Sequence, residues 1–260
     1  MLRRMTLLLS LVAIPAASSP ERLVGAEPKK TVAILYFDNY TGKSDYDPLG
    51  KGISSMMISD LSVVKEIQLV ERDRMQDLIK EIDLQHTNYF DSTTSVKVGR
   101  MVGAQYVVVG AFASVDPQMR IDTRVVRVET GEVVKSAQVT GDQDKFFDLE
   151  KKLSDRLIDG LGLALSPEEQ QQLAAKQQAN RVDALNTMAD FSQALALYDR
   201  QDYEGAVKRM APAVRRSPNS ALITVAYDDM KRRAAANLAD KAKSKLKSGL
   251  GGFFKKPPQF

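Results

Sequence analysis

Few residue types capable of enzyme chemistry occur in this 260-residue sequence. Cysteine and tryptophan are absent, and His86 is the only histidine. The absence of cysteine excludes disulfide scaffolds, thiolate zinc sites and cysteine nucleophiles. A metal site made of several histidines is excluded as well, and a Ser-His-Asp site would have to use His86. His86 follows a predicted helix and has no convergent partners in the sequence, so we expect it in a turn or on the surface.

Two pairs of aspartates and one glycine-rich segment could also carry chemistry. Asp45 with Asp47, and Asp142 with Asp144, have the local spacing of a calcium loop or a carboxylate pair, but no EF-hand pattern follows either of them. We interpret them as caps and turn residues. Gly50–Gly52 precedes a helical pattern and could hold an anion, yet it lacks the spacing of a phosphate loop. The sequence therefore predicts no catalytic, cofactor-binding or metal-binding residue, no cofactor, and a protein that is not an enzyme.

The first part of the chain alternates strand and helix patterns. Continuous apolar runs predict buried strands, and alternation of apolar and polar residues predicts half-exposed ones. The strands are expected at Thr31–Phe37, Ile67–Val70, Tyr106–Phe112, Met119–Val125 and Val133–Thr140. Apolar stripes of helical period predict helices at Leu49–Val64, Met75–Ile82, Ser92–Val102 and Phe147–Leu161. This order predicts an α/β (α+β) fold, a mixed sheet with packed helices.

Several helix ends are marked by particular residues. We expect Asp47 to cap the first helix, with Pro48 in its first turn, and Gly103 to end the third helix in a left-handed conformation. Met101 is expected to face inward from that third helix. Ser166 begins a capping box, and only helix patterns follow it, so an all-α carboxyl-terminal segment is predicted.

Three stretches of the α/β part carry a family resemblance. They are LVERDRMQDLIKE at 69–81, VGRMVGAQYVVVGAF at 98–112 and RVVRVETGEVVKSAQV at 124–139. In this order, after a first strand of the AILYFDN type, they resemble the CsgG family of curli production, assembly and transport and its relatives with a TolB-amino-terminal-like α/β fold. The resemblance spans Thr31 to about Gly160 and implies a role in cell-envelope or surface-appendage assembly. The family's barrel hairpins are not expected, because Ser114–Gln118 is shorter than the roughly nine to eleven residues of a spanning strand.

The helical part resembles one tetratricopeptide repeat over Thr187–Ser220. Its six typical positions are Ala194, Tyr203, Ala206, Met210, Ala213 and Pro218. No second repeat follows at the 34-residue spacing, and a solitary repeat cannot bury its face alone. It must therefore dock on the α/β domain, on the following helix at Ala221–Ala239, or on a partner. An ordinary helical hairpin is the alternative interpretation.

The two ends of the chain predict its compartment and one contact surface. Arg3 and Arg4 precede an apolar run at Leu7–Ala17, typical of a signal peptide cleaved after Ala26, with an uncleaved anchor as the alternative. We expect a periplasmic protein, associated with the outer membrane, that is not a lipoprotein because it lacks cysteine. Lys231–Phe260 contains nine basic residues and one acidic residue. This basic tail could contact anionic lipid headgroups, or it could be a frayed, solubilising end.

We divide the chain into a signal peptide at 1–26, a CsgG/TolB-like domain at 27–162, a helical linker at 163–186, a tetratricopeptide-like segment at 187–240 and a basic tail at 241–260. The expected partners are other envelope or secretion proteins and not nucleic acid, and a homo-oligomer stays open. The expected partner-binding residues are Tyr203, Met210, Phe253, Phe254, Lys255 and Lys256. The function expected is that of a scaffold or accessory in curli-type assembly and secretion. The alternative is a periplasmic regulator that activates a cell-wall synthase.

Overall fold

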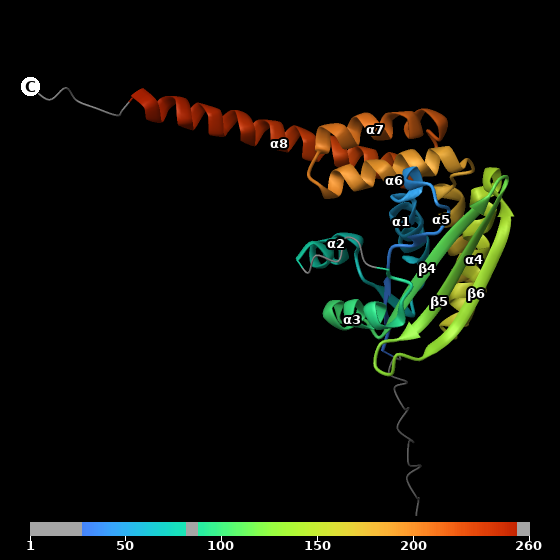
Figure 1. Ribbon diagram of the computed structural model, residues 1–260. Helices are drawn as coiled ribbons and strands as arrows, with labels where there is room; N and C mark the ends of the chain where they lie inside the picture. The colour runs from blue at the N-terminus through green and yellow to red at the C-terminus, as the bar shows by residue number, and fades with distance from the viewer. Residues whose placement is uncertain (1–27, 82–87, 254–260) are drawn as a thin grey trace, which may run out of the picture.

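The computed structural model describes residues 28–81 and 88–253, and Figure 1 shows their arrangement. The strands are β1 (Lys30–Ile34), β2 (Asp38–Asn39), β3 (Ile67–Leu69), β4 (Tyr106–Val115), β5 (Gln118–Arg127) and β6 (Val133–Asp142). The helices are α1 (Leu49–Leu61), α2 (Arg72–Glu81), α3 (Ser92–Val102), α4 (Phe146–Gly160), α5 (Pro167–Asn180), α6 (Leu185–Asp199), α7 (Tyr203–Arg216) and α8 (Ala221–Phe253). The predicted α/β class with a helical carboxyl-terminal segment is confirmed.

The strands form one mixed sheet in the order β3-β1-β4-β5-β6, and β2 pairs separately with β4. β1 runs parallel to β3 and β4, with Val32 opposite Tyr106. β4, β5 and β6 are antiparallel, and Phe112 lies opposite Ile121. Only Asp116 and Pro117 separate β4 from β5, so the short connection expected there is confirmed. The parallel strands are apolar on both sides because helices cover both faces of the sheet.

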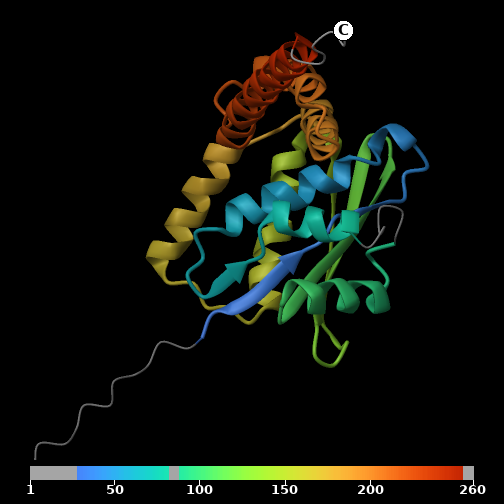
Figure 2. The same cartoon turned by 90° about the vertical axis from the view of Figure 1, so that its left-hand side faces the viewer.

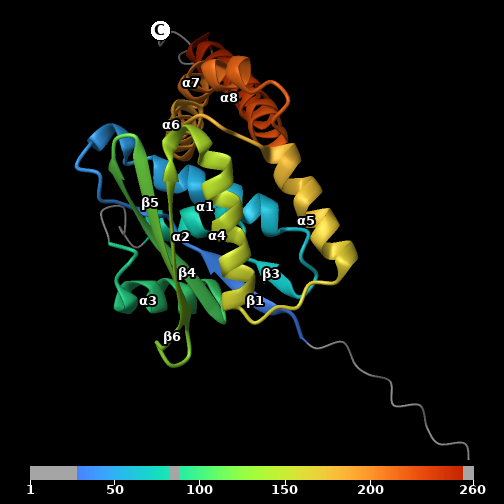
Figure 3. The same cartoon turned by 90° about the vertical axis from the view of Figure 1, so that its right-hand side faces the viewer.

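The two faces of the sheet carry different layers. Alternate residues of β1 point to opposite faces. Val32 and Ile34 pack with α1 and α4, whereas Ala33 and Leu35 pack with α2 and α3. Figure 2 views the molecule from the side of α2 and α3, and Figure 3 views it from the side of α4 and α5.

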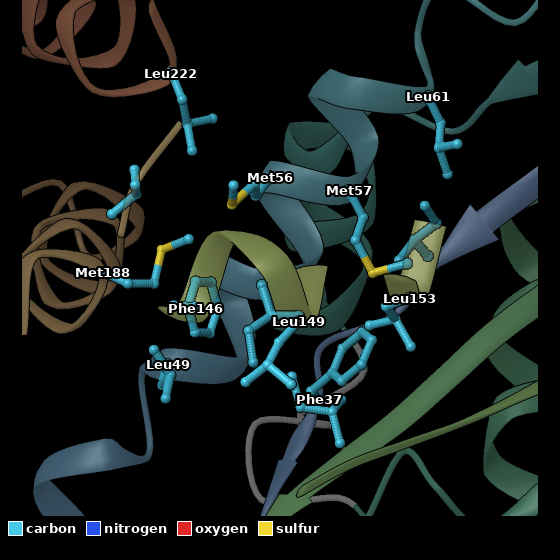
Figure 4. Packing of buried hydrophobic residues seen from close by; sticks show 14 of the residues in the cluster. Phe37, Leu49, Met56, Met57, Leu61, Phe146, Leu149, Leu153, Met188 and Leu222 are labelled. Carbon is cyan, nitrogen blue, oxygen red and sulfur yellow. The ribbon is translucent and has the colours of Figure 1, made fainter. Parts of the chain in front are cut away.

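The helical segment shares its core with the α/β part. Close packing joins Leu49 and Met56 of α1 to Phe146 of α4, Met188 of α6 and Leu222 of α8 (Figure 4). Each of these side chains is less than a tenth exposed, and full burial of such a side chain contributes about 1.5–3 kcal/mol. The two segments that differ in the sequence pattern are therefore packed together as one body.

Two predicted helix ends are confirmed by their hydrogen bonds. Ser166 and Glu169 form the reciprocal capping box at the start of α5. Gly103 ends α3 with φ +73°, a conformation that glycine adopts without strain. Asp91 caps α3, because its carboxylate accepts a hydrogen bond from the Thr94 backbone at 3.0 Å, so Ser92 is the first helical residue.

Three local predictions are corrected. Pro48, and not Asp47, is the cap residue of α1, because the Asp47 carboxylate accepts a hydrogen bond from the Asn39 side chain instead. Met101 is 40% exposed, since Val98 and Val102, one turn apart, occupy the face of α3 that meets the sheet. β1 ends at Ile34, although the buried residues continue to Phe37.

The carboxyl-terminal helices surround one end of the α/β part. α5 packs on α1 through buried residues that include Leu173 and Asn180. α6 and α7 form an antiparallel hairpin that contacts α1 on one side and α8 on the other. α8 is packed up to Met230 and then extends away from the body (Figure 1). No helix in the described part of the chain has the length and apolar character needed to cross a membrane.

Candidate functional site

A cluster of charged side chains joins the α/β part to the helical hairpin. The Asp199 carboxylate at the end of α6 lies 2.6 Å from the Lys51 ammonium of α1 and 2.6 Å from the Arg72 guanidinium of α2. The Asp199 side chain is only 4% exposed, and those of Lys51 and Arg72 are 23% and 12% exposed. Because the three charges are largely removed from water, each depends on the others for compensation.

Neutral polar groups complete this junction. The Gln76 side-chain oxygen accepts hydrogen bonds from the Tyr36 hydroxyl and the Lys51 ammonium, both at 2.8 Å. The Lys51 ammonium also lies over the Tyr36 ring, 4.7 Å from its centroid, and the Tyr89 ring meets Tyr36 edge-on at 6.1 Å. Lys51 therefore has an ion pair, a hydrogen bond and a cation–π contact at once.

Burial sets the protonation of these groups. It lowers the pKa of Lys51, and Asp199 opposes that shift. It raises the pKa of Tyr36, which therefore stays neutral. Burial acts to lower the pKa of Arg72 as well, but Asp199 outweighs it and the pKa of Arg72 is raised. The junction thus holds charged Arg72 and a neutral tyrosine around one carboxylate.

The junction forms one wall of a cleft of about 490 Å³, lined by Tyr36, Asp38, Tyr40, Lys51 and Arg200 among others. The cleft lies beyond the carboxyl end of β1. β3, which follows β1 in the chain, lies on one side of β1, and β4 lies on its other side. The cleft is therefore at the topological switch point of the parallel strands. Such a place commonly holds a ligand in open α/β sheets.

The polar side chains of the cleft are largely bound to one another. The Asp38 carboxylate accepts hydrogen bonds from the backbone of Tyr89 at 3.2 Å and of Phe90 at 2.8 Å. The Asn39 amide donates to Asp47 at 2.7 Å. These contacts fix the loops around the cleft, so the arrangement favours positioning of the backbone over chemistry on a substrate. The described residues hold no group of three or more histidines, aspartates or glutamates that could bind a metal ion.

The predicted glycine-rich segment has a packing role that sequence analysis missed. A side chain on Gly52 would meet Ser192 of α6, and its Cβ would lie 3.1 Å from the sulfur of Met188. A side chain on Gly50 would likewise collide with the Phe37 backbone. Gly52 therefore allows α6 to approach α1 closely. The small residues in the helical stripe were the signal that could have indicated this close approach.

A second set of contacts continues from the junction to α8. The Tyr198 hydroxyl of α6 donates to the Asp229 carboxylate of α8 at 2.7 Å. The Arg72 guanidinium lies 5.9 Å from the Tyr198 ring centroid, so Tyr198 links α2 with α8. Partial burial, followed by the contact with Asp229, raises the pKa of Tyr198 to about 12.

Two of the predicted partner-binding residues, Tyr203 and Met210, lie in α7. Tyr203 begins α7, is half-buried and packs edge-on against the Tyr198 ring, with 5.3 Å between centroids. Met210 is fully buried in the core, so only Tyr203 of this pair reaches the surface. Phe253 is the last residue of α8. Its side chain, together with Phe254, Lys255 and Lys256, lies outside the described residues, and so does His86.

The aspartate pair Asp142 and Asp144 has a local role. Asp142 caps a short 3-10 helix and accepts a hydrogen bond from the Asp144 backbone at 3.0 Å, which confirms the interpretation of this pair as a cap. The six tetratricopeptide positions lie in the α6–α7 hairpin and the loop after it. That this hairpin is a tetratricopeptide repeat stays a prediction.

Comparison with solved structures found chains of low sequence identity. The LpoB carboxyl-terminal domain from Salmonella enterica is 17% identical over 46% of this chain and 87% of its own, with a TM-score of 0.38. Lipoprotein GNA1162 from Neisseria meningitidis is 12% identical over 51% and 98%, with a TM-score of 0.38. The PelC dodecamer from Paraburkholderia phytofirmans is 18% identical over 54% and 91%, with a TM-score of 0.34. These TM-scores are low, so the likenesses support no statement about function.

The family comparison covers the first part of the chain. No curated protein sequence matches this one. The model described as "Curli production assembly/transport component CsgG" matches residues 16–120, which include the first two of the three resembling stretches. The resemblance to the CsgG family is therefore confirmed for the segment from residue 16 to residue 120.

Proposed function

We propose that this chain is an exported, non-catalytic accessory or scaffold protein of cell-envelope or surface-appendage assembly and secretion. It acts in the periplasm, next to the outer membrane, by binding other envelope proteins. The observation that carries the proposal is the match of residues 16–120 to the CsgG family. The helical hairpin supports it, because Asp199 fixes the hairpin to the α/β part as a rigid surface that a partner can recognise.

The exposed part of α8 is the proposed membrane contact of this scaffold. Residues 231–247 carry seven basic side chains and one acidic one. Exposed apolar residues recur every three or four positions along this segment. They are Ala235, Leu238, Ala239, Ala242 and Leu246. Leu238 is 50% exposed and Leu246 is 65% exposed.

The charge of this segment indicates what kind of surface it binds. Two copies of so basic a helix repel each other, whereas an anionic lipid surface attracts it by about 1 kcal/mol for each basic residue near the headgroups. Lysines flank the apolar stripe, as in helices that lie in the plane of a membrane interface. We therefore assign α8 beyond Met230 to anionic lipid headgroups, and the surface around Tyr203 to a protein partner.

Photocrosslinking in intact cells tests the proposed function. A photoreactive residue is placed at Tyr203 on the hairpin and, as a matched control, at Arg120 on the exposed side of the sheet. Capture of a secretion or outer-membrane component from position 203 alone supports the assembly role. Capture of a cell-wall synthase replaces it with the regulator alternative. A cytoplasmic location in fractionated cells contradicts both.

A further inference from the structure

Two carboxyl groups are buried together where the carboxyl-terminal helices pack on the α/β part. Asp60 of α1 is 0% exposed and Glu150 of α4 is 1% exposed. Burial of an ionised carboxylate is costly unless a cation or several donors compensate it. Neither residue forms an ion pair in the described part of the chain. The negative charge of this pair must therefore be compensated by something other than an ion pair.

One oxygen of each carboxyl group has a donor. Asp60 Oδ1 accepts from the Asn180 amide of α5 at 2.5 Å, and Glu150 Oε1 accepts from the Ser154 hydroxyl at 2.7 Å. The other two oxygens, Asp60 Oδ2 and Glu150 Oε2, are buried and have no N–H or hydroxyl donor among the described residues. Each carboxyl group shifts the pKa of the other, so the two buried side chains are close neighbours. Two ionised carboxylates have no hydrogen to donate to each other, so a hydrogen bond between them requires that one of them be protonated.

We propose that Asp60 and Glu150 share one proton at neutral pH, and that this proton holds α4 and α5 against α1. Glu150 is the donor and Asp60 the acceptor. The Asn180 amide binds the same Asp60 carboxylate, so α5 is attached to the pair as well. The Asn180 backbone carbonyl in turn accepts a hydrogen bond from Ser220, directly before α8, at 3.0 Å. The shared proton therefore lies where α5 and the start of α8 attach to the α/β part.

The charged groups around the pair favour this assignment. Burial and the adjacent Asp60 raise the pKa of Glu150 well above its usual range, and Asp155 on the same helix adds to the shift. Burial also raises the pKa of Asp60, while Asn180, Glu150 and Lys176 of α5 act in the opposite direction. Lys176 can thus stabilise one negative charge on Asp60, but a second negative charge on Glu150 would remain uncompensated.

The direction of the pH effect follows from proton binding. The unfolded chain releases the shared proton at about pH 4, whereas the folded chain keeps it. Folding is therefore weakened as pH rises from that value to the folded-state pKa of Glu150, by about tenfold in the folding equilibrium constant for each pH unit. Loss of the proton leaves two negative charges in contact, and α5 and the base of α8 should loosen first.

Urea unfolding and hydrogen exchange of the full chain test this inference. Between about pH 6 and about pH 9, the wild-type folding constant should fall, and exchange in α5 should accelerate more than exchange in β4. Glu150→Gln keeps a donor for Asp60 but cannot ionise, so its folding constant should lose most of this pH dependence. Glu168→Gln, at an exposed carboxylate of α5, should behave like the wild type. Equal pH dependence in wild type and Glu150→Gln would overturn the proposal.

Infrared spectroscopy of the wild type gives a test that needs no variant. A protonated carboxyl group at neutral pH should show the carbonyl stretch of a carboxylic acid, and this band should disappear as the folded protein is titrated upward. Absence of the band contradicts the shared proton. Stabilisation by Ca²⁺ or Mg²⁺ at constant pH, with the band lost, would also overturn it and assign the same oxygens to a cation.

Discussion

The Asp199 carboxylate of α6 lies 2.6 Å from the Lys51 ammonium of α1, although 148 residues separate them in the chain. Together with Arg72, this pair joins the CsgG-like segment to the helical hairpin that follows it. The hairpin is thereby held in one orientation relative to the sheet. The first prediction tests how strongly this junction contributes to stability.

Asp199→Asn should destabilise the protein by about 2–3 kcal/mol, because Lys51 and Arg72 would keep their charges in a largely buried place without a carboxylate. The free energy of unfolding in urea measures this. Asp122→Asn is the matched control, since its ion pair with Arg120 is exposed, and its effect should stay within about 0.5 kcal/mol. Equal effects of the two changes would show that the junction is not compensated as the geometry indicates.

Gly52→Ala should cost about 1–3 kcal/mol, because the added methyl group meets the Ser192 hydroxyl and must push α6 away from α1. Ser192→Ala removes that hydroxyl, so the double variant should regain part of the loss. Urea unfolding of the two single variants and the double variant gives the coupling energy. Strictly additive effects would show that the helices do not touch at this point.

Tyr198→Phe should cost about 1 kcal/mol through loss of the hydrogen bond to Asp229 and should accelerate hydrogen exchange in the first turns of α8. Tyr227→Phe on α8 is the control, because no hydroxyl hydrogen bond of Tyr227 is seen among the described residues. No difference in α8 exchange between the two variants would contradict a link through Tyr198.

Acid should weaken the hydrogen bond between Tyr198 and Asp229. Partial burial acts to raise the pKa of Asp229, but the hydrogen bonds from Tyr198 and Arg232 outweigh it, and the pKa of Asp229 is lowered. The stabilisation that ionised Asp229 provides is fully present above its unfolded-state pKa of about 3.9. It is lost as pH falls through the lower pKa of Asp229 in the folded state. Acid titration of stability in wild type and Tyr198→Phe should therefore converge at low pH. Curves that stay parallel would exclude Asp229 as the partner.

Replacing Lys241 and Lys247 together by Gln should weaken binding to phosphatidylglycerol vesicles by about 2 kcal/mol, or about thirtyfold, because two basic residues leave the headgroup region. Sedimentation of the full chain with vesicles measures this at low salt, and added salt should reduce the binding of the unchanged chain. Lys151→Gln with Lys152→Gln, at exposed positions of α4, is the matched control. Equal loss in the two double variants would remove the lipid role from α8.

Local sequence patterns were sufficient to predict most elements. Continuous apolar runs predicted β1 and β4, alternation predicted β5, and the turn after β5 predicted β6 as its hairpin partner. Ser166 with Glu169 predicted the start of α5. These signals work because side-chain period, capping and turn chemistry depend on residues a few positions apart. They were less accurate at ends such as Asp47, where a side-chain contact with Asn39 competes with the cap.

By itself the sequence determined the fold class, the order of the elements and the resemblance to CsgG. Only the tertiary structure decided which distant groups meet. Asp60 lies beside an apolar stripe and gives no local sign that it faces Glu150, and nothing near Lys51 indicates Asp199. Such pairs form because strand order and helix packing bring remote segments together, and they depend on burial that no short stretch of sequence encodes.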